Sequence, residues 1–240
     1  MLQISDEVYL DEIFSNINIQ NKLLPSTYER LPYIIIKDFI SQKLCSEIAK
    51  DVRLHNNSNE KAKLKDQPVL GVVKSKLNED IRKTNIYELK QEYVDIYNKQ
   101  FLYHLPKIEE FYKVVLSFST PIQALEYKEG YFYKKHADDS SMILKDGKVV
   151  DFLNVAPRRK LTTVLFTTTQ NETKDDNIHF SGGELVFNYL YTKEKNNIIL
   201  KPSSGDMVIF PSNPYFTHEV LKVTKGYRLS LVQWHDIINL

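Results

Sequence analysis

The stretch Gly182-Gly183-Glu184-Leu185-Val186-Phe187-Asn188-Tyr189-Leu190-Tyr191 decides the fold class, because a glycine pair opens a run of aliphatic and aromatic residues. Similar short runs recur after Phe118: Gln123–Tyr127, Lys160–Thr168, Asn197–Leu200, Asp206–Phe210, His218–Val223 and Arg228–Trp234. Turn signals separate them, among them Asp146-Gly147, Ser204-Gly205 and Lys225-Gly226. Short strands at this spacing predict an antiparallel sandwich or jelly roll.

Upstream of these runs the pattern is mainly helical. Tyr33–Ile36 predicts one strand, and Ser41 then precedes a helical pattern through Leu44, Ile48 and Val52. Two further helices are predicted around a break near Pro106, from two sets of apolar positions: Leu89, Tyr93, Ile96 and Tyr97, then Leu105, Ile108, Phe111 and Val115.

The remaining N-terminal segments carry weaker signals. Residues 1–30 predict a short helix with an irregular lead-in, and the polar residues 55–68 predict a surface loop. No linker divides the chain, so we expect a single domain over 1–240, with 1–117 as a mainly helical support and 118–240 as the β core.

Composition narrows the class of protein. Hydrophobic residues make up 42% of the 240 and charged residues 26%, as in soluble globular proteins. Lys plus Arg (32) nearly balance Asp plus Glu (31), so we expect neither a nucleic-acid nor a membrane partner. A single cysteine, Cys45, excludes an internal disulfide, and no secretory signal or membrane span is evident, so we expect a cytoplasmic protein.

One short motif suggests a metal site. In Tyr127-x-x-Gly130-x-x-Tyr133-x-x-His136-x-Asp138, the last two residues would share one face of an extended strand. Alone, such a pair is more often an exposed polar edge than a metal site, and a lone histidine such as His218 is more often a structural residue than a ligand. Together, His136, Asp138 and His218 supply the two imidazoles and one carboxylate of the facial triad of non-haem Fe(II) oxygenases.

Arg228 is a candidate ligand for an anion. It lies ten residues after His218, in Gly226-Tyr227-Arg228-Leu229-Ser230, and it shares a strand face with Ser230. A guanidinium grips a carboxylate through two parallel hydrogen bonds, although a lone strand arginine is more often a surface residue. A dicarboxylate that chelates a metal at one end would need such a partner at the other.

About 200 residues of the chain resemble the prolyl 4-hydroxylase-like family of Fe(II)/2-oxoglutarate dioxygenases. The matching segments, in order, are Phe39–Cys45, Tyr127–Asp138, Arg159–Thr162, Gly182–Phe187, Lys201–Asp206, Ile209–Ser212, His218–Val220, Val223–Ser230 and Trp234. The resemblance implies an α+β fold with a double-stranded β-helix core and N-terminal helices packed on one sheet. It also implies that the single domain is catalytic.

The resemblance also implies roles for individual residues. Iron would be bound by His136, Asp138 and His218, and the distal carboxylate of 2-oxoglutarate by Arg228. Tyr127, Thr162, Ser230 and Val220 would assist the cosubstrate, Tyr133 would face the substrate, and Trp234 would lie near the metal or serve as a core aromatic. Fe(II), 2-oxoglutarate and O2 are the implied cofactors, with ascorbate as a reductant.

In this family 2-oxoglutarate is decarboxylated to succinate while a C–H bond is hydroxylated. Asp138 favours hydroxylation over halogenation, because halogenating relatives give up this carboxylate. A prolyl residue in a peptide or protein leads as substrate. A free amino acid or natural-product precursor and a non-catalytic metal- or 2-oxoglutarate-binding sensor are the alternatives, and fold-level analogy cannot choose among them.

Two departures from the family pattern bear on the site. Phe166 stands where some relatives carry a tyrosine whose hydroxyl binds 2-oxoglutarate, so this hydrogen bond must come from elsewhere. The segment 139–158 is long for the family and contains the hairpin-like Lys145-Asp146-Gly147-Lys148. Since it directly follows Asp138, we expect it to cover the pocket and shape substrate choice.

Overall fold

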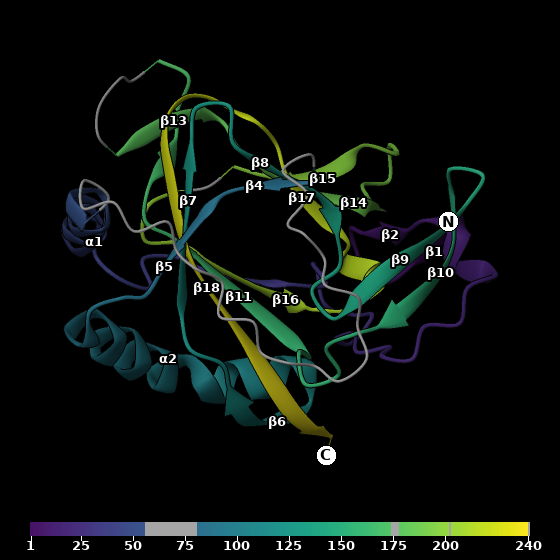
Figure 1. Cartoon of the computed structure of the whole chain (residues 1–240). Helices are drawn as coiled ribbons and strands as arrows, with labels where there is room; N and C mark the ends of the chain where they lie inside the picture. The colour runs from purple at the N-terminus through teal and green to yellow at the C-terminus, as the bar shows by residue number, and fades with distance from the viewer. Residues whose placement is uncertain (56–80, 174–177, 202, 240) are drawn as a thin grey trace.

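The computed structural model describes residues 1–55, 81–173, 178–201 and 203–239. The predicted loop at 55–68 therefore lies outside the described residues except for His55, which ends a helix. Two curled sheets face each other as a double-stranded β-helix, and both long helices lie beside one of them (Figure 1). The predicted fold class, α+β with a jelly-roll core, is confirmed.

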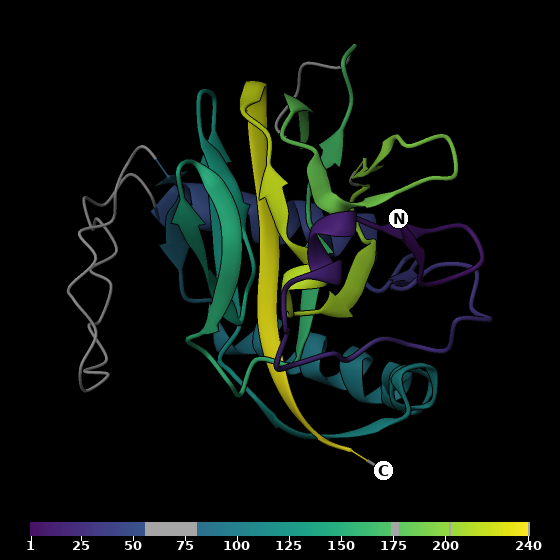
Figure 2. The ribbon, with the colours of Figure 1, turned by 90° about the vertical axis from the view of Figure 1, so that its right-hand side faces the viewer.

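The larger sheet, called the major sheet below, runs β12-β13-β18-β11-β16-β3, with β6 and β7 also paired to β18 and β5 paired to β7. Its strands are β3 (Ile34–Ile36), β5 (Asn85–Tyr87), β6 (Val114–Ser119), β7 (Gln123–Lys128), β11 (Leu161–Phe166), β12 (Thr169–Gln170), β13 (His179–Gly182), β16 (Met207–Pro211) and β18 (Val223–Asn239). The long β18 crosses the whole molecule in Figure 2 and pairs with four strands, so it is the central strand of this sheet.

The minor sheet runs β1-β2-β14-β17-β8-β4, with β15 paired to β14. Its strands are β1 (Leu2–Gln3), β2 (Tyr9–Leu10), β4 (Arg82–Lys83), β8 (Phe132–His136), β14 (Leu185–Tyr191), β15 (Asn197–Leu200) and β17 (His218–Val220). Two short 3-10 helices, η1 (Glu12–Ser15) and η2 (Pro214–Phe216), complete the described elements together with the helices α1 (Gln42–His55) and α2 (Gln91–Tyr112) and a separate hairpin.

Alternation along β11 shows how the sequence separates the two faces of the major sheet. Leu161 and Leu165 belong to the cluster under the helices, whereas Val164 and Phe166 belong to the cluster between the sheets. All six residues of β11 are buried, and because side chains alternate across a strand, both of its faces are covered. Hence β11 is covered by helices on one side and faces the minor sheet on the other.

Helix α1 (Gln42–His55) begins where the sequence predicts, since the Ser41 Oγ accepts the Leu44 amide N–H at 3.2 Å. It packs on the major sheet through buried residues such as Cys45 and Ile48. The helices therefore cover one sheet, as expected.

Helix α2 (Gln91–Tyr112) corrects the prediction of two helices, because it continues through Pro106. The proline nitrogen leaves the Leu102 carbonyl without its helical donor, but Leu102 is exposed and water can solvate that group. The apolar stripe continues across the proline and packs on the major sheet. Its buried members are Tyr97, Phe101, Ile108 and Tyr112. Because residues on both sides of Pro106 are buried against the same sheet, the segment forms one continuous helix and not two.

The N-terminal segment also differs from the expected short helix. It forms β1, β2 and the single turn η1, because β2 adds to the edge of β14, pairing Leu10 with Leu190. Such pairing between distant segments overrides local propensity. The first 117 residues supply strands to both sheets, so the division at 117/118 does not separate two layers.

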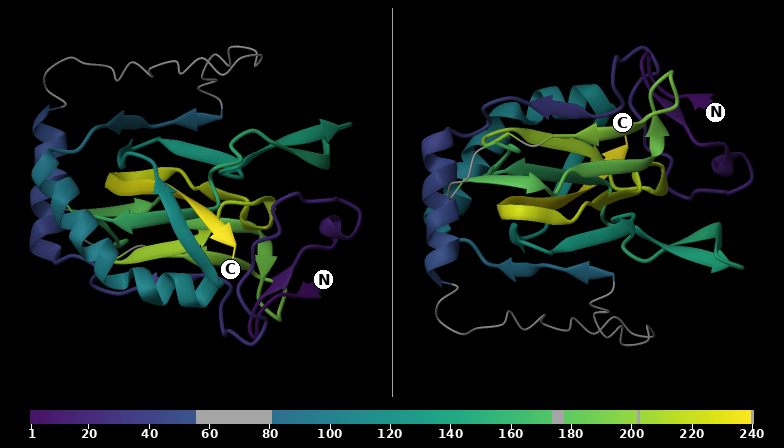
Figure 3. Two further views of the ribbon diagram at one scale, coloured as in Figure 1. Left: turned by 90° about the horizontal axis from the view of Figure 1, so that it is seen from below. Right: turned by 90° about the horizontal axis from the view of Figure 1, so that it is seen from above.

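The predicted turn at Lys145–Lys148 is confirmed as a hairpin of β9 (Ser140–Lys145) and β10 (Lys148–Asn154). Asp146 and Gly147 both have positive φ, +51° and +74°, as a two-residue hairpin loop requires. The hairpin projects from the end of the molecule that carries the N-terminus, away from α1 (Figure 3). Neither α1 nor α2, the long helices of the described ranges, is apolar enough to cross a membrane.

Candidate active site

A cavity of about 190 Å³ lies between the two sheets. All nine predicted site residues line it: Tyr127, Tyr133, His136, Asp138, Thr162, His218, Val220, Arg228 and Ser230. They come from the major sheet, the minor sheet and the bend after β8. Residues far apart in the sequence thus converge on one cavity between the sheets.

The major-sheet wall follows from strand alternation. Arg228, Ser230 and the next two alternate residues of β18, Val232 and Trp234, all line the cavity. Their neighbours Leu229 and Leu231 belong to the cluster under the helices. A period of two is what a regular strand imposes, so Arg228 faces inward because of its register.

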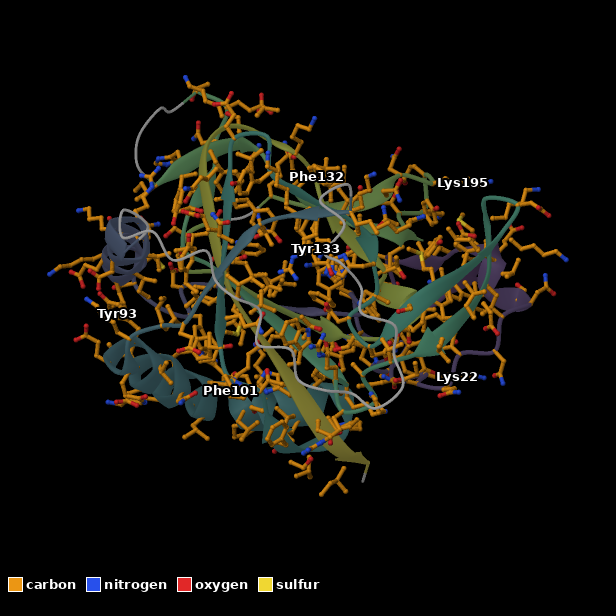
Figure 4. The ribbon with its side chains drawn as sticks, in the orientation of Figure 1. Lys22, Tyr93, Phe101, Phe132, Tyr133 and Lys195 are labelled. Carbon is orange, nitrogen blue, oxygen red and sulfur yellow. The ribbon has the colours of Figure 1, made fainter. Side chains whose placement is uncertain are left out.

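The minor-sheet wall depends on an irregularity. His218 pairs with His136, but Val220 pairs with Tyr133, so β8 has one extra residue opposite β17. Three residues apart on a regular strand, Tyr133 and His136 would point to opposite faces; the bulge brings both to the cavity. Their rings stack with centroids 3.5 Å apart, and Figure 4 shows Tyr133 between the sheets.

Three potential metal ligands meet at this wall. One ligand atom from each of His136, Asp138 and His218 lies within 4.8 Å of the others. The Asp138 carboxylate oxygens are 3.7 Å from His136 Nε2 and 4.0 Å from His218 Nε2. Asp138 lies in a bend beyond the end of β8, so the proximity comes from that bend and not from the extended H-x-D pair that the sequence suggested.

Both imidazoles are oriented for coordination through Nε2. His136 Nδ1 lies 2.9 Å from the Lys134 carbonyl oxygen, and His218 Nδ1 lies 2.9 Å from the Phe216 carbonyl oxygen. A carbonyl can only accept, so each Nδ1 must carry the proton and each Nε2 presents its lone pair. Backbone carbonyls commonly fix metal-binding histidines in this way.

Protonation states also suit a metal. Burial, with a contribution from His218, lowers the pKa of His136 to about 3, so its imidazole is neutral at pH 7. Burial alone would raise the pKa of Asp138, but the two histidines and a hydrogen bond from Thr162 hold it below its ordinary value. A neutral imidazole and an ionised carboxylate are the forms that bind a cation.

A pair of hydroxyls supports the carboxylate. Thr162 Oγ1 donates to Asp138 Oδ2 at 2.7 Å, and it lies 2.8 Å from Ser212 Oγ. Since the only hydroxyl proton of Thr162 goes to the carboxylate, Ser212 must donate to Thr162. Thr162 lines the cavity as expected, but its hydrogen bond is made with Asp138.

Arg228 is buried on the opposite wall. Its Nε donates to the Gly183 carbonyl at 2.9 Å, one Nη donates to Ser230 Oγ at 3.2 Å, and Tyr127 stacks 4.8 Å from the guanidinium carbon. Burial lowers its pKa, yet a guanidinium stays protonated. No described carboxylate forms an ion pair with it. A buried cation that faces a cavity is suited to bind an anion.

Glycine is required at position 183 for this arrangement. Its φ is +63°, and an added Cβ would lie 3.1 Å from Arg228 Cδ and 3.0 Å from atoms of both Phe180 and Val223. The Gly182-Gly183 pair that marked the fold in the sequence therefore also makes room for the arginine.

Three functional candidates escaped the sequence analysis. Arg82 of β4 stacks over Tyr133 at 4.5 Å, and Arg159 stacks over Trp234 at 4.0 Å; both arginines and Trp234 line the cavity. Ser212 supports Thr162, as described above. Arg159 and Ser212 stand in motifs that the sequence analysis quoted, whereas no sequence signal marks Arg82.

The expectation that residues 139–158 cover the pocket is wrong for the described cavity, since none of them lines it. Instead Phe152 of the hairpin packs with Ile19 and Tyr189 in a separate small cluster. Phe166 lies in the core with its ring 5.6 Å from the Arg228 guanidinium carbon, and it has no hydroxyl to offer.

Comparisons with known proteins agree with this geometry. Residues 122–236 match the family model of the 2OG-Fe(II) oxygenase superfamily. No curated protein sequence matches the chain.

Solved structures share the fold at low identity. A prolyl-4-hydroxylase from Pseudomonas putida is 20% identical, with 85% of this chain and 91% of that chain covered and a TM-score of 0.54. A viral collagen prolyl hydroxylase from Paramecium Bursaria Chlorella virus-1 is 19% identical, with 86% of this chain and 96% of that chain covered and a TM-score of 0.54. A prolyl hydroxylase from Trichoplax adhaerens, solved in complex with a hypoxia inducible factor peptide fragment, is 15% identical. The match covers 85% of this chain and 83% of that chain, with a TM-score of 0.57.

Proposed function

We propose that the chain is a 2OG-Fe(II) oxygenase that hydroxylates an unactivated C–H bond, with a prolyl residue in a peptide or protein as the leading substrate; the match of residues 122–236 to that superfamily's model supports this. One observation carries the proposal: His136, Asp138 and His218 converge within 4.8 Å in a cavity that also contains the buried Arg228. The donor set of two imidazoles and a carboxylate fits Fe(II).

Each wall has its own task in this proposal. His136 and His218 would hold iron through Nε2, and Asp138 through a carboxylate oxygen that Thr162 leaves available. Arg228, with Ser230 and Tyr127 beside it, would bind the distal carboxylate of 2-oxoglutarate, and Val220 would pack against the cosubstrate. Bound iron supplies the chemistry, in which decarboxylation of 2-oxoglutarate to succinate accompanies transfer of oxygen to the substrate.

Tyr133 and Trp234 would contact the substrate side of the cavity. Both line it, and each is stacked by an arginine, so their rings present fixed apolar faces. Asp138 as a third protein ligand favours hydroxylation, because halogenation needs its coordination position for halide. Ascorbate is proposed as the reductant, and a reducing cytoplasm suits the lone buried Cys45.

A second substrate class, a free amino acid, is also compatible with the size of the cavity. Its volume of about 190 Å³ is below the range of roughly 300–1,000 Å³ for typical ligand pockets. After the cosubstrate has bound, only a small group can enter. A free amino acid meets this limit, as does one side chain of a peptide.

The test is mass spectrometry of proline-containing peptides and free amino acids after incubation with Fe(II), 2-oxoglutarate and O2, with succinate measured in parallel. We expect a gain of one oxygen, and its loss in His136→Ala. A matched control is His104→Ala, since His104 lies on α2 outside the cavity. Binding of metal and 2-oxoglutarate without succinate or product for any substrate would favour a sensor.

A further inference from the structure

The cavity contains more positive charge than the proposed chemistry uses. Three arginines line it, Arg82, Arg159 and Arg228, against one carboxylate, Asp138. In the proposed loaded state, Fe(II) would add two positive charges and 2-oxoglutarate two negative ones. Two positive charges therefore remain in a confined space where opposite charge is strongly favoured.

Arg82 is the cation that the rest of the site does not use. It lies on the edge strand β4, opposite Tyr133 of β8, and its guanidinium lies over the Tyr133 ring. That ring stacks in turn on His136, so Arg82 is one aromatic ring away from a potential metal ligand.

Arg82 also has unused hydrogen-bonding capacity. Its Nε is buried and has no hydrogen-bond partner. Among the ion pairs of the described residues none includes Arg82, although nearly all buried polar groups in folded proteins find a partner. A group that enters the cavity can supply it.

Arg159 differs because the protein already holds it. One Nη donates to the Asp138 backbone carbonyl at 3.3 Å, and the guanidinium carbon lies 4.0 Å from the centre of the Trp234 ring. Arg159 therefore contributes charge, whereas Arg82 contributes charge together with a buried Nε donor that has no partner.

Building on the proposed function, we propose that the substrate carries a carboxylate close to the carbon that is hydroxylated, and that Arg82 binds this carboxylate beside Tyr133. The carboxylate has two possible sources. It is either an acidic side chain next to the target residue in a peptide, or the α-carboxylate of a free amino acid. Arg82 thereby selects substrates and is not a catalytic residue.

The experiment uses two matched pairs of probes. The first is a capped peptide with a glutamate next to proline and its glutamine twin, and the second is L-proline and L-prolinamide. Trp234, the single tryptophan of the chain, lines the cavity, so its fluorescence reports binding. The protein is loaded with Zn(II), which is redox-inactive, and with 2-oxoglutarate, so that binding is measured without turnover.

We expect the anionic member of one pair to bind about tenfold tighter than its neutral twin, as a charge-assisted hydrogen bond would give. The responding pair identifies the source of the carboxylate. In Arg82→Met this preference falls to near one while the affinity for the neutral twin is retained, and Arg82→Lys keeps part of it. In turnover with Fe(II), the same loss appears in KM and not in kcat.

Arg158→Met is the matched control, because Arg158 is an exposed arginine that pairs with Asp236 outside the cavity. It must keep the preference. Equal binding of both twins in both pairs, including no binding of either, overturns the proposal, as does an unchanged preference in Arg82→Met. The proposed function fails separately, if no succinate forms with Fe(II) under any condition.

Discussion

Arg228 enters the cavity from within a strand of 17 residues, whereas His136, Asp138 and His218 enter it from strands of five and three residues and from a bend. The arginine end is held by a long regular ladder and by burial. The metal end is held by a bulge, by two backbone carbonyls and by a pair of hydroxyls. The two walls therefore differ in what fixes them.

This difference has a functional consequence. A side chain on a long buried strand keeps its position when a neighbour changes, so changes at the arginine end should act on cosubstrate affinity alone. Ligands on short irregular segments depend on individual hydrogen bonds, so small changes there should act on metal affinity. The predictions below test whether the two ends separate in this way.

The largest effect is expected for Arg228→Met, which removes the buried cation but keeps an unbranched side chain. Removing one partner of a buried charge pair costs roughly 2–5 kcal/mol, which is about 30-fold or more in affinity for 2-oxoglutarate. Metal affinity should stay the same, since no metal ligand contacts Arg228. Isothermal titration with 2-oxoglutarate, and separately with Co(II), measures both quantities.

The control for this variant is Arg228→Lys, which keeps the charge and loses the planar fork. It should recover part of the affinity. Thermal unfolding of both variants shows whether the Gly183 carbonyl, left without its donor, has destabilised the fold. Loss of Co(II) binding in a folded Arg228→Met protein would contradict the separation of the two ends.

A smaller effect is expected at the metal end for Thr162→Val, which is nearly isosteric and removes the hydroxyl. Second-layer partners of metal ligands typically contribute about 10- to 100-fold to metal affinity. We expect Co(II) affinity to fall within this range and the Co(II) absorption spectrum to change, because Asp138 loses the donor that orients it. The affinity for 2-oxoglutarate, measured at saturating metal, should change less.

Thr162→Ser restores the hydroxyl and should bind Co(II) nearly as the wild type does. Ser212→Ala, which removes only the second hydroxyl, should have an intermediate effect. If Thr162→Val instead weakened 2-oxoglutarate and left Co(II) unchanged, the hydroxyl would serve the cosubstrate, as the family resemblance implies.

The same contrast explains what the sequence could predict. Residues with regular alternation, such as Arg228 and Ser230, were placed correctly because a strand's period fixes their face. The turn at Asp146-Gly147 was predictable because its chemistry is local. The three candidate metal ligands are predicted from their residue types, yet the bulge that aligns Tyr133 with His136 has no local signature.

Other features depend on contacts between distant segments. Pro106 suggested a break, but the buried stripe around it keeps one helix, and the packing of that stripe is a property of the assembled sheet. Arg82 reaches the cavity only because β4 pairs with β8, so nothing near it in the sequence indicates a role. The hairpin after Asp138 packs away from the site for the same reason: Phe152 finds its partners in Ile19 and Tyr189.

The smallest effect is expected for Phe166→Tyr, which adds a hydroxyl at the arginine end. The Phe166 ring lies 5.6 Å from the Arg228 guanidinium carbon, so a carboxylate bound there lies near the new group. One neutral hydrogen bond contributes about 0.5–1.5 kcal/mol, which predicts a KM for 2-oxoglutarate lowered by roughly 2- to 10-fold with Co(II) affinity unchanged. A folded variant whose KM does not fall would place the carboxylate out of reach of residue 166, and a changed Co(II) affinity would show that the two walls are coupled.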